Sequence, residues 1–505
     1  MDAARTNAYF DSADWLVIFM YLVGICAFGL WFGKGLKNTR DYFLGSRNIP
    51  WWGVGLSIIA SETSALTIIG VPAMAYADDL RFIQIVIGYV IARVILAIVL
   101  VPHYFKGEIY SPYELLSNSF GPDARRVAAF FFLIAGTLAA GVRVYVACIP
   151  IQLMLNLSIF PAILLFVGLS LTYTFAGGIK AVVWTDAVQF VLFTAGGIFT
   201  LLYVPQLFDG GFSEIFAKAA KAGKLTWLNA HFSLQMPFNI WMGVIGGTVQ
   251  VMFSHGADQL IVQRVLTCKS SAEGRKAMIL SAVIILPLFL IFLLTGIMLW
   301  VYYQQFPMAI PIPETTAGLP KNDFIFPIFI LTAVPTVMKG LMIVAILSAA
   351  MSSVSSALSA LASVFTMDVS RASESAGADT KKALRFGRWS TVFWASMLVV
   401  VAYACRKVEF VFNAAFGLSG LTSGALLGGL IFALLVRKGS ALPVIVGMIT
   451  SFGVMLIIHL ETQIAWPWYS LIGTLVTLGV ASAVRVFVAK GASEQSAPAR
   501  HQAKN

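Results

Sequence analysis

Serine hydroxyls recur through residues 345–371 at a spacing that suits ion binding. The segment reads AILSAAMSSVSSALSALASVFTMDVSR and is apolar enough to lie in a bilayer. Separations of three and four residues place its hydroxyls on one face of a helix. These hydroxyls belong to Ser348, Ser352, Ser355, Ser356, Ser359 and Ser363. Two interpretations are open. Small polar residues let membrane helices pack closely, whereas oxygen ligands bind a hard cation, with a bare carbonyl from an opened helix completing the site.

Four charged residues fall inside apolar segments, where a charge is costly unless it faces the protein interior and has a partner. They are Glu62, Arg93, Arg143 and Asp186. Arg143 either forks a substrate carboxylate or forms a structural pair with Glu62 or with a helix end. Arg93 has no obvious partner in the sequence, so a structural role is favoured for it. Asp186 is expected to cap its helix, to pair with Lys180 or to bind an ion.

The composition indicates the class of protein that must position these groups. Of the 505 residues 59% are hydrophobic and only 11% are charged, and the mean hydropathy is +0.86. Apolar runs of roughly 20 residues recur along the whole chain, which predicts an all-α polytopic membrane protein. The net charge of +11 is attributed to Lys and Arg in cytoplasmic loops rather than to nucleic-acid binding. The four cysteines stand singly, without metal-type spacing, and are expected to be small core residues.

Thirteen candidate membrane spans follow from these runs. They lie near residues 15–33, 51–75, 83–102, 127–155, 160–176, 183–206, 236–254, 277–303, 338–367, 388–405, 410–436, 441–459 and 467–488. The cations of alternate loops, among them Lys34, Arg264 and Lys381, predict an N-terminus outside and a C-terminus in the cytoplasm. We expect residues 1–489 to form one transmembrane domain in the plasma (inner) membrane. Residues 490–505 are expected to be a disordered cytoplasmic tail.

Two of these spans are predicted to be broken helices. The second span carries glycines and a proline around a polar centre, Ser61-Glu62-Thr63-Ser64. The seventh, WMGVIGGTVQVMFSHGADQ, is rich in glycine. Irregular backbone is tolerated at membrane depth only where it lines a cavity or is buried in protein. Five spans separate the starts of the two, as expected for two five-helix repeats that each open with an interrupted helix.

Four segments carry a resemblance to the sodium/solute symporter family. They are DYFLGSRNIPWWGVGLSIIASETSALTIIGVPAMAY, GGIKAVVWTDAVQ, DQLIVQRVLTCKS and the serine-rich segment ending FTMDVSR. The resemblance implies a LeuT-like core of five plus five helices in inverted repeat, with broken first and sixth core helices. It also implies a first sodium site between the first broken helix and the serine-rich helix. The matching positions are the carbonyls of Ala60, Thr63 and Ala349 and the hydroxyls of Ser352 and Ser353.

Within this family the sequence is most similar to the bacterial sialic acid symporters. That similarity implies a second sodium site. The matching positions are Asp186, Ser352, Ser355 and Ser356. It also implies a substrate site with Ser64, Thr67 and Arg143, in which Arg143 holds the substrate carboxylate. Glu62 falls in the same site but departs from the uncharged polar centre of those proteins, and it would repel a carboxylate or engage Arg143. A carboxylated sugar such as sialic acid is the first expectation, and another organic acid, an amino acid or a neutral sugar is the alternative.

The predicted function is sodium-coupled symport of a small organic solute by alternating access, with two sodium ions. Sodium ions are the expected cofactors. The solute and membrane lipid are the expected partners, without nucleic acid or an obligate protein partner. A channel would need a continuous polar pore or a ring of identical charges, and isolated charges on different helices argue against it. A membrane sensor would carry a signalling domain. An enzyme would need a nucleophile beside a base, and the histidines fall in loops, at span ends or in the tail, with His255 bordering a helix end.

Overall fold

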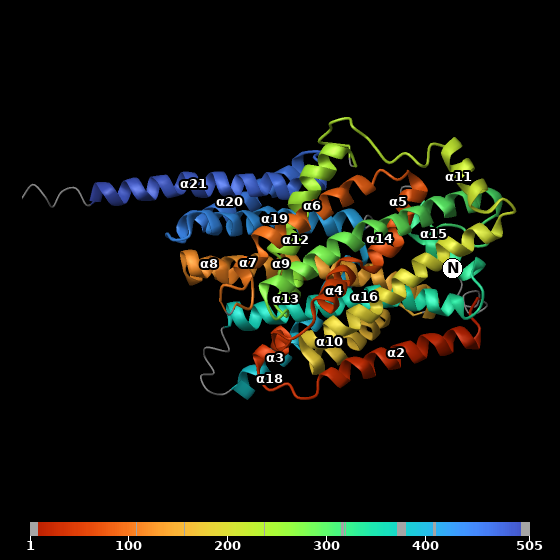
Figure 1. Ribbon diagram of the computed structural model, residues 1–505, viewed down its shortest axis with the longest axis horizontal. Coiled ribbons are helices and arrows are strands. Elements are labelled where there is room, and N and C mark those ends of the chain that lie inside the picture. The colour runs from red at the N-terminus through yellow and green to blue at the C-terminus, as the bar shows by residue number, and fades with distance from the viewer. Residues whose placement is uncertain are drawn as a thin grey trace, which may run out of the picture.

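The computed structural model is a bundle of α-helices (Figure 1). It describes residues 9–107, 109–155, 157–236, 238–314, 318, 320–370, 380–407 and 411–495. The helices follow the apolar segments of the sequence, because a chain in a bilayer must satisfy its backbone hydrogen bonds within each segment. In chain order they are α2 (Ser12–Phe32), α3 (Thr39–Leu44), α4 (Trp51–Glu62), α5 (Ala65–Ala77), α6 (Ile83–Val99), α7 (Val101–Tyr104), α8 (Tyr113–Phe120), α9 (Pro122–Leu155), α10 (Ile159–Tyr203), α11 (Gly211–Lys221), the π-helix η3 (Met242–Gly247), α12 (Thr248–Gly256), α13 (Gln259–Val265), α14 (Ser271–Gln305), α15 (Ile325–Ala333), α16 (Met338–Val364), the π-helix η5 (Phe365–Val369), α18 (Thr380–Ala404), α19 (Val411–Val436), α20 (Leu442–Glu461) and α21 (Tyr469–Gln495).

The number of spans depends on how the irregular helices are counted. Among the described residues, eight helices are long and apolar enough to cross a membrane, and the bent pair α4 and α5 makes nine. α10 covers two of the thirteen expected spans, because it runs on through a break at Gly178. The remaining expected spans correspond to α6, α12 and α18, which are shorter or more highly charged. Helix α21 extends to Gln495, past the expected start of the tail at residue 490, and residues 496–505 lie outside the described residues.

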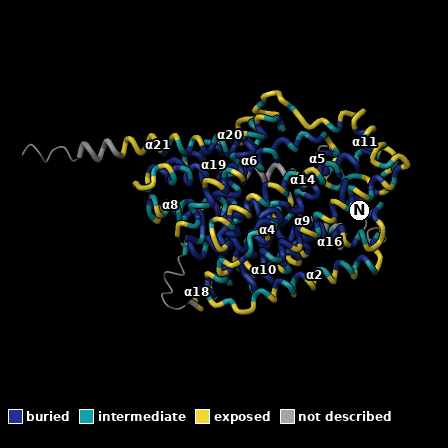
Figure 2. Tube along the Cα trace, in the orientation of Figure 1, coloured by how far each residue is buried: buried dark blue, intermediate teal, exposed yellow. Residues whose placement is uncertain are grey.

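The serine-rich segment forms α16, the most buried of the candidate spans. In its most apolar window 94% of the residues are buried, compared with 17% in α2 and 22% in α21, and Figure 2 shows the exposed surface of those two outer helices. α16 packs against α2, α9, α10 and α18. Its first turn is capped by Asp14 of α2, whose Oδ1 accepts the amides of Val337 at 2.8 Å and Gly340 at 3.0 Å. The serine stripe therefore contacts protein on all sides.

Both predicted helix breaks are present. α4 ends at Glu62 and α5 begins at Ala65, and the two helices are bent by 59°. In the second case α12 ends at Gly256 and α13 begins at Gln259. Asp258 lies in this break and caps α13, because its side chain accepts the Leu260 amide at 2.8 Å. The expectation of interrupted first and sixth core helices is confirmed.

The two ends of the bundle carry different segments. In Figure 1 α2 begins at the right-hand end and α21 ends at the left-hand end, as an odd number of crossings requires. The left-hand end holds α3, α8 and the start of α18, and the right-hand end holds α11 and α15. The loops that the sequence analysis grouped as cytoplasmic therefore share one end of the molecule.

Candidate functional site

Asp186 lies at the centre of a buried network that joins α10 to α4, α13 and α16. The Asp186 and Arg264 side chains are both fully buried, and Arg264 Nη2 lies 2.9 Å from Asp186 Oδ2. The same oxygen accepts hydrogen bonds from the hydroxyls of Ser57 at 2.6 Å and Ser61 at 3.3 Å. Asp186 Oδ1 accepts one hydrogen bond, from the Ser352 hydroxyl at 2.7 Å. The two oxygens thus differ: Oδ2 has three donors, whereas Oδ1 faces α16 and has one.

The prediction that Arg264 is a loop cation was wrong. Arg264 belongs to α13, which packs against α4 and α16, so its guanidinium lies beside Asp186. It also donates to the Ser57 hydroxyl at 2.8 Å and to the hydroxyl of Ser356. The alternatives for Asp186 need the same correction: its cationic partner is Arg264, and the Lys180 ammonium instead lies over the Phe32 ring.

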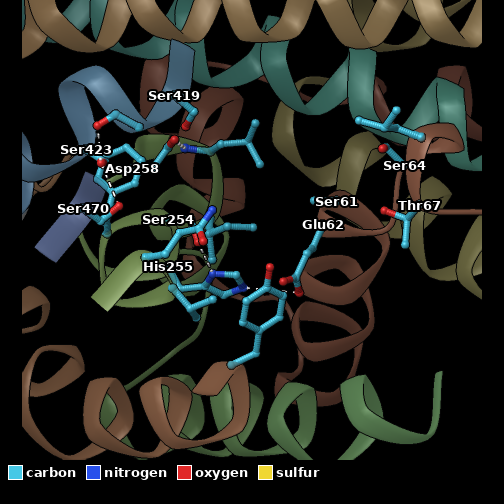
Figure 3. A pocket seen from close by; sticks show the side chains of 18 of the residues that line it. Ser61, Glu62, Ser64, Thr67, Ser254, His255, Asp258, Ser419, Ser423 and Ser470 are labelled. Atoms are coloured by element: carbon cyan, nitrogen blue, oxygen red, sulfur yellow. Dashed lines mark hydrogen bonds and ion pairs between the residues drawn. The ribbon is translucent and has the colours of Figure 1, made fainter. Parts of the chain in front are cut away.

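Glu62 and Arg93 form a second buried group. Arg93 Nη2 donates to Glu62 Oε2 and, at 3.0 Å, to His255 Nε2, while Nη1 donates to the Tyr89 carbonyl at 2.9 Å. Since a guanidinium only donates, we assign the His255 proton to Nδ1, which lies 2.9 Å from the Ser254 hydroxyl. Figure 3 shows the side chains of Glu62 and His255 facing each other on the wall of the pocket. Arg93 therefore has a charged partner, which its sequence context did not reveal.

The ion-pair partner of Glu62 is Arg93 rather than Arg143, although Asp258 and Glu62 attract the Arg143 guanidinium electrostatically. Arg143 lies on α9 and lines the same cavity as Glu62. Within the described part of the chain its side chain makes no hydrogen bond or ion pair. Asp258 lines this cavity as well. Arg143 thus offers an unused guanidinium to whatever fills the cavity.

The cavity brings all four predicted substrate residues together. The volume of this cavity is about 110 Å³, which is enough for several water molecules or a small solute. Its polar lining residues are Ser61, Glu62, Ser64, Thr67, Arg143, Gln250, Ser254, His255, Asp258, Ser419, Ser423 and Ser470. Its aromatic lining residues are Phe82, Tyr89, Phe253, Phe289 and Trp466. Gln250 Oε1 is buried and, among the described residues, has no hydrogen-bond donor. The lining therefore combines apolar rings with a few unused polar groups, as small-molecule sites do.

The five residues predicted for a first sodium site lie where the break between α4 and α5 meets α16, and all are buried. The Ser64 amide donates to a carbonyl that is closer in the sequence than the Ala60 carbonyl. The Ala60 carbonyl therefore lacks the amide that a continuous helix would supply. Thr63 Oγ1 is buried without a partner in the described part of the chain. On α16 the Ser353 hydroxyl donates to the Ala349 carbonyl at 3.1 Å. These uncharged oxygens suit a hard cation.

The residues predicted for a second sodium site also come together, but Arg264 shares their surroundings. The hydroxyls of Ser355 and Ser356 donate to the Ser352 carbonyl at 3.1 and 2.5 Å. Ser356 also accepts from Arg264. The site therefore already contains one permanent cation, which the sequence analysis did not foresee.

Some of these partners left a signal in the sequence and others did not. Ser57 stands four residues before Ser61, so the helical spacing that identified the stripe of α16 also finds Ser57. Arg264 lies in the apolar run IVQRVL, which is a sign of burial. That sign was obscured because the run follows a predicted membrane span. Nothing in the sequence pairs Glu62 with Arg93, which lie 31 residues apart on different helices. His255 was likewise missed, because a lone histidine near a helix end has many possible roles.

The chain resembles known membrane transporters in sequence and in fold. A family model described as the sodium:solute symporter family matches residues 42–451. Two sodium/sialic acid symporters, of Aliivibrio fischeri and Proteus mirabilis, are each 29% identical over 483 residues, covering 93% and 92% of this chain and 92% and 93% of theirs. The solved structure of a Na⁺-coupled sialic acid symporter, substrate-bound and outward-open, matches with a TM-score of 0.86 at 26% identity, over 95% of this chain and 98% of that one. The transporter Mhp1 shares the fold at 13% identity, with a TM-score of 0.54 over 89% of this chain and 94% of its own.

Proposed function

Because this chain belongs to the sodium:solute symporter family, we propose that it imports a carboxylated sugar of the sialic acid type. Family membership makes it a sodium-coupled transporter that crosses the membrane several times, and not an enzyme. The observation that carries the choice of solute is Arg143, an intramembrane guanidinium in the cavity that makes no hydrogen bond or ion pair among the described residues, although Asp258 and Glu62 attract it electrostatically. Such a cation calls for an anion, and its two parallel donors match a carboxylate. The two relatives named for sialic acid transport support the same choice.

The remaining substrate residues are Glu62, Ser64 and Thr67. Ser64 and Thr67 offer hydroxyls from the start of α5, on the wall of the cavity that Figure 3 shows with Glu62. Glu62 does not disfavour an anionic solute as its charge alone suggests, because Arg93 compensates it. A neutral sugar would leave the hydrogen-bond donors of Arg143 unused, so another carboxylic acid or an amino acid is the stronger alternative.

For the first sodium ion we propose the carbonyls of Ala60, Thr63 and Ala349 and the hydroxyls of Ser352 and Ser353. Support comes from the Ala60 carbonyl, which lacks its helical amide partner, and from Thr63 Oγ1, a buried oxygen without a partner in the described residues. No member of this set titrates, so the set suits an alkali ion better than a proton. Ser352 is the one member that is engaged elsewhere, through its hydrogen bond to Asp186.

For the second sodium ion we propose Asp186, Ser352, Ser355 and Ser356. The support is that the two oxygens of the Asp186 carboxylate have different partners. Oδ2 accepts a hydrogen bond from Arg264, and Oδ1 faces α16. Since Arg264 already neutralises much of the carboxylate charge, we expect the second ion to bind more weakly than an isolated carboxylate would allow.

Coupling then follows from linkage between the sites. A sodium ion that bridges the α4–α5 break and α16 orders the wall of the cavity that carries Ser64 and Thr67. Sodium and solute therefore favour each other's binding by the same factor. Two sodium ions with one monoanionic solute carry one net charge inward, and a membrane potential of about 100 mV contributes about 2.3 kcal/mol per charge.

The orientation that we propose has the N-terminus outside and the C-terminus in the cytoplasm of a bacterial inner membrane. It is supported by the cluster of basic loops at the end of the bundle that holds α3, α8 and α18. A second cavity of about 520 Å³ includes Gly70, Asp323 and Trp466, and Trp466 also lines the substrate cavity. This second cavity is the proposed entry from outside. Residues 1–489 are proposed as one transport domain, with 490–505 as a cytoplasmic tail.

Uptake of radiolabelled sialic acid into proteoliposomes tests the proposed function. We expect accumulation under an inward sodium gradient and none under an equal potassium gradient. Sodium, but not potassium, is expected to raise the thermal stability of the purified protein, and sialic acid to raise it further only with sodium present. Uptake driven equally well by a proton gradient without sodium would refute the assignment.

A further inference from the structure

The substrate cavity contains an acid whose charge is already compensated. Glu62 Oε2 accepts from Arg93, whereas Oε1 has no protein partner among the described residues. The Glu62 side chain keeps 16% of its surface exposed, while Arg93 is fully buried behind it and His255 keeps 2%. One carboxylate oxygen of Glu62 is thus free to meet a ligand in the cavity, and an ionised carboxylate only accepts hydrogen bonds.

The free guanidinium lies on the other side of the cavity. Arg143 shares a smaller adjoining cavity with Asp258 and Ser419. Figure 3 shows Asp258 and Ser419 on the side opposite Glu62, Ser64 and Thr67. A solute that places its carboxylate on Arg143 therefore extends its other groups toward Glu62.

We propose that Glu62 recognises the hydroxyl or amide donors of the solute, with Arg93 and His255 as the residues that position it. This inference rests on the proposed function and specifies its solute class: an acid that carries hydrogen-bond donors at a distance from its carboxylate. A carboxylic acid without hydroxyls would bind only Arg143, and a neutral sugar would bind only Glu62.

Arg93 and His255 make this arrangement compatible with an anionic solute. Arg93 supplies the counter-charge from outside the cavity, so the pair adds no net repulsion toward the carboxylate. His255 accepts from Arg93 through Nε2 and faces Ser254 through Nδ1, so it is neutral and limits the rotation of the guanidinium. Tyr89, Arg143 and Asp258 are the other titratable residues that line this cavity. The Glu62 carboxylate is therefore held in place before the solute arrives.

A site built around a hydrogen-bond acceptor should reject analogues that lack the donor, because the acceptor is then left buried and unpaired. The test compares N-acetylneuraminate with tetrahydropyran-2-carboxylate, which has a similar ring and carboxylate but no hydroxyls. Each ligand is titrated in sodium buffer, and binding is followed as thermal stabilisation of the purified full-length protein. We expect the parent protein to prefer N-acetylneuraminate by about a hundredfold or more.

The variant Glu62→Met/Arg93→Met removes the acceptor and its counter-charge together, because an Arg93 left alone would be an uncompensated buried charge. We expect its affinity for N-acetylneuraminate to fall about ten- to a hundredfold, the worth of hydrogen bonds to a charged group. Its affinity for tetrahydropyran-2-carboxylate should stay within about twofold. Ser423→Ala is the matched control, because it removes one polar group from the opposite wall and should affect the two ligands equally. If the double variant does not fold, as judged by the loss of a cooperative unfolding transition, Glu62→Gln/Arg93→Gln replaces it, since it also removes both charges, and it should show a smaller loss confined to N-acetylneuraminate.

The possible outcomes separate the proposed role of Glu62 from the proposed transport function. An equal loss for both ligands, or no loss for either, overturns the role of Glu62. If N-acetylneuraminate does not stabilise the parent protein while sodium does, the proposed solute is wrong, and the inference that rests on it falls with it.

Discussion

At the scale of single residues, buried charge is organised by pairing. Of the intramembrane charges visible in the sequence, Glu62 is paired with Arg93 and Asp186 with Arg264. Arg143 makes no hydrogen bond or ion pair within the described residues, although Asp258 and Glu62 attract it electrostatically. Because an unpaired charge at membrane depth is expensive, the unused hydrogen-bond donors of Arg143 mark the place of a ligand, whereas Glu62 and Asp186 are charge-compensated and can each offer one carboxylate oxygen to a ligand.

Replacing Arg143 by Lys is the direct test of that role. We expect the affinity for sialic acid to fall about ten- to a hundredfold, because a single ammonium cannot reproduce the two parallel hydrogen bonds of a guanidinium. Sodium-dependent thermal stabilisation should survive. Arg126→Lys on the same helix is the control, since Arg126 is half exposed and pairs with Asp123. A loss of stability in Arg143→Lys without a loss of affinity would assign Arg143 a structural role instead.

The second sodium site is tested without touching its ion pair. Ser355→Ala removes one proposed ligand, and we expect the sigmoidal sodium dependence of uptake to become hyperbolic and the charge moved per solute to fall by one. Ser359→Ala, one turn further along α16, is the matched control. Asp186→Ala by itself is expected to destabilise the protein by about 3–5 kcal/mol, because Arg264 would be left buried without a counter-charge. An unchanged charge-to-solute ratio in Ser355→Ala would contradict the second site.

At the scale of elements, breaks in helices decide where the polar groups meet. The break between α4 and α5 exposes a carbonyl toward α16, the break before α13 sends Arg264 inward, and the break at Gly178 directs the second part of α10 so that Asp186 meets α16. Gly178 has φ 55° and ψ −154°, and a Cβ at this position would lie 2.4 Å from the Tyr42 carbonyl oxygen. Only glycine fits such a turn without strain.

Gly178→Ala is therefore expected to lower the thermal stability of the protein and to weaken sodium binding. This combination of positive φ and extended ψ is essentially restricted to glycine and costs a residue with a Cβ about 1–3 kcal/mol, and the contact with Tyr42 adds to that cost. Gly168→Ala is the matched control on the same helix, because its Cβ would meet nothing within 4 Å, and it should be neutral or slightly stabilising. Equal unfolding temperatures for the two variants would show that the turn is not constrained as described.

At the scale of the whole molecule, the bundle has two different ends and a cavity between them. The substrate cavity and its neighbour share Trp466. At the end that holds α8, Arg125 Nε lies 2.6 Å from Asp368 Oδ1. This ion pair links the start of α9 to η5, the π-helix that follows α16. This arrangement suits a transporter that is closed at one end while the solute enters from the other.

The orientation predicts the behaviour of reporter fusions in a bacterial host. We expect a green fluorescent protein fused after residue 495 to fluoresce, because it would stay in the cytoplasm. Alkaline phosphatase inserted after Lys224, in the loop that follows α11 at the opposite end of the bundle, should be active. The reverse pattern would invert the proposed topology without changing the sites.

The sequence by itself was sufficient for the membrane class, the two broken helices and the residues that gather around them. These follow from hydropathy, helical spacing and glycine content, which are local properties of the chain. The partners of the buried charges were decided only by the tertiary structure. Glu62 meets Arg93, and Asp186 meets Arg264, because helices distant in sequence pack against one another, and neither hydropathy nor spacing specifies which of several cations will face a given acid. For the same reason only the folded structure shows that Arg93, and not Arg143, forms the ion pair with Glu62.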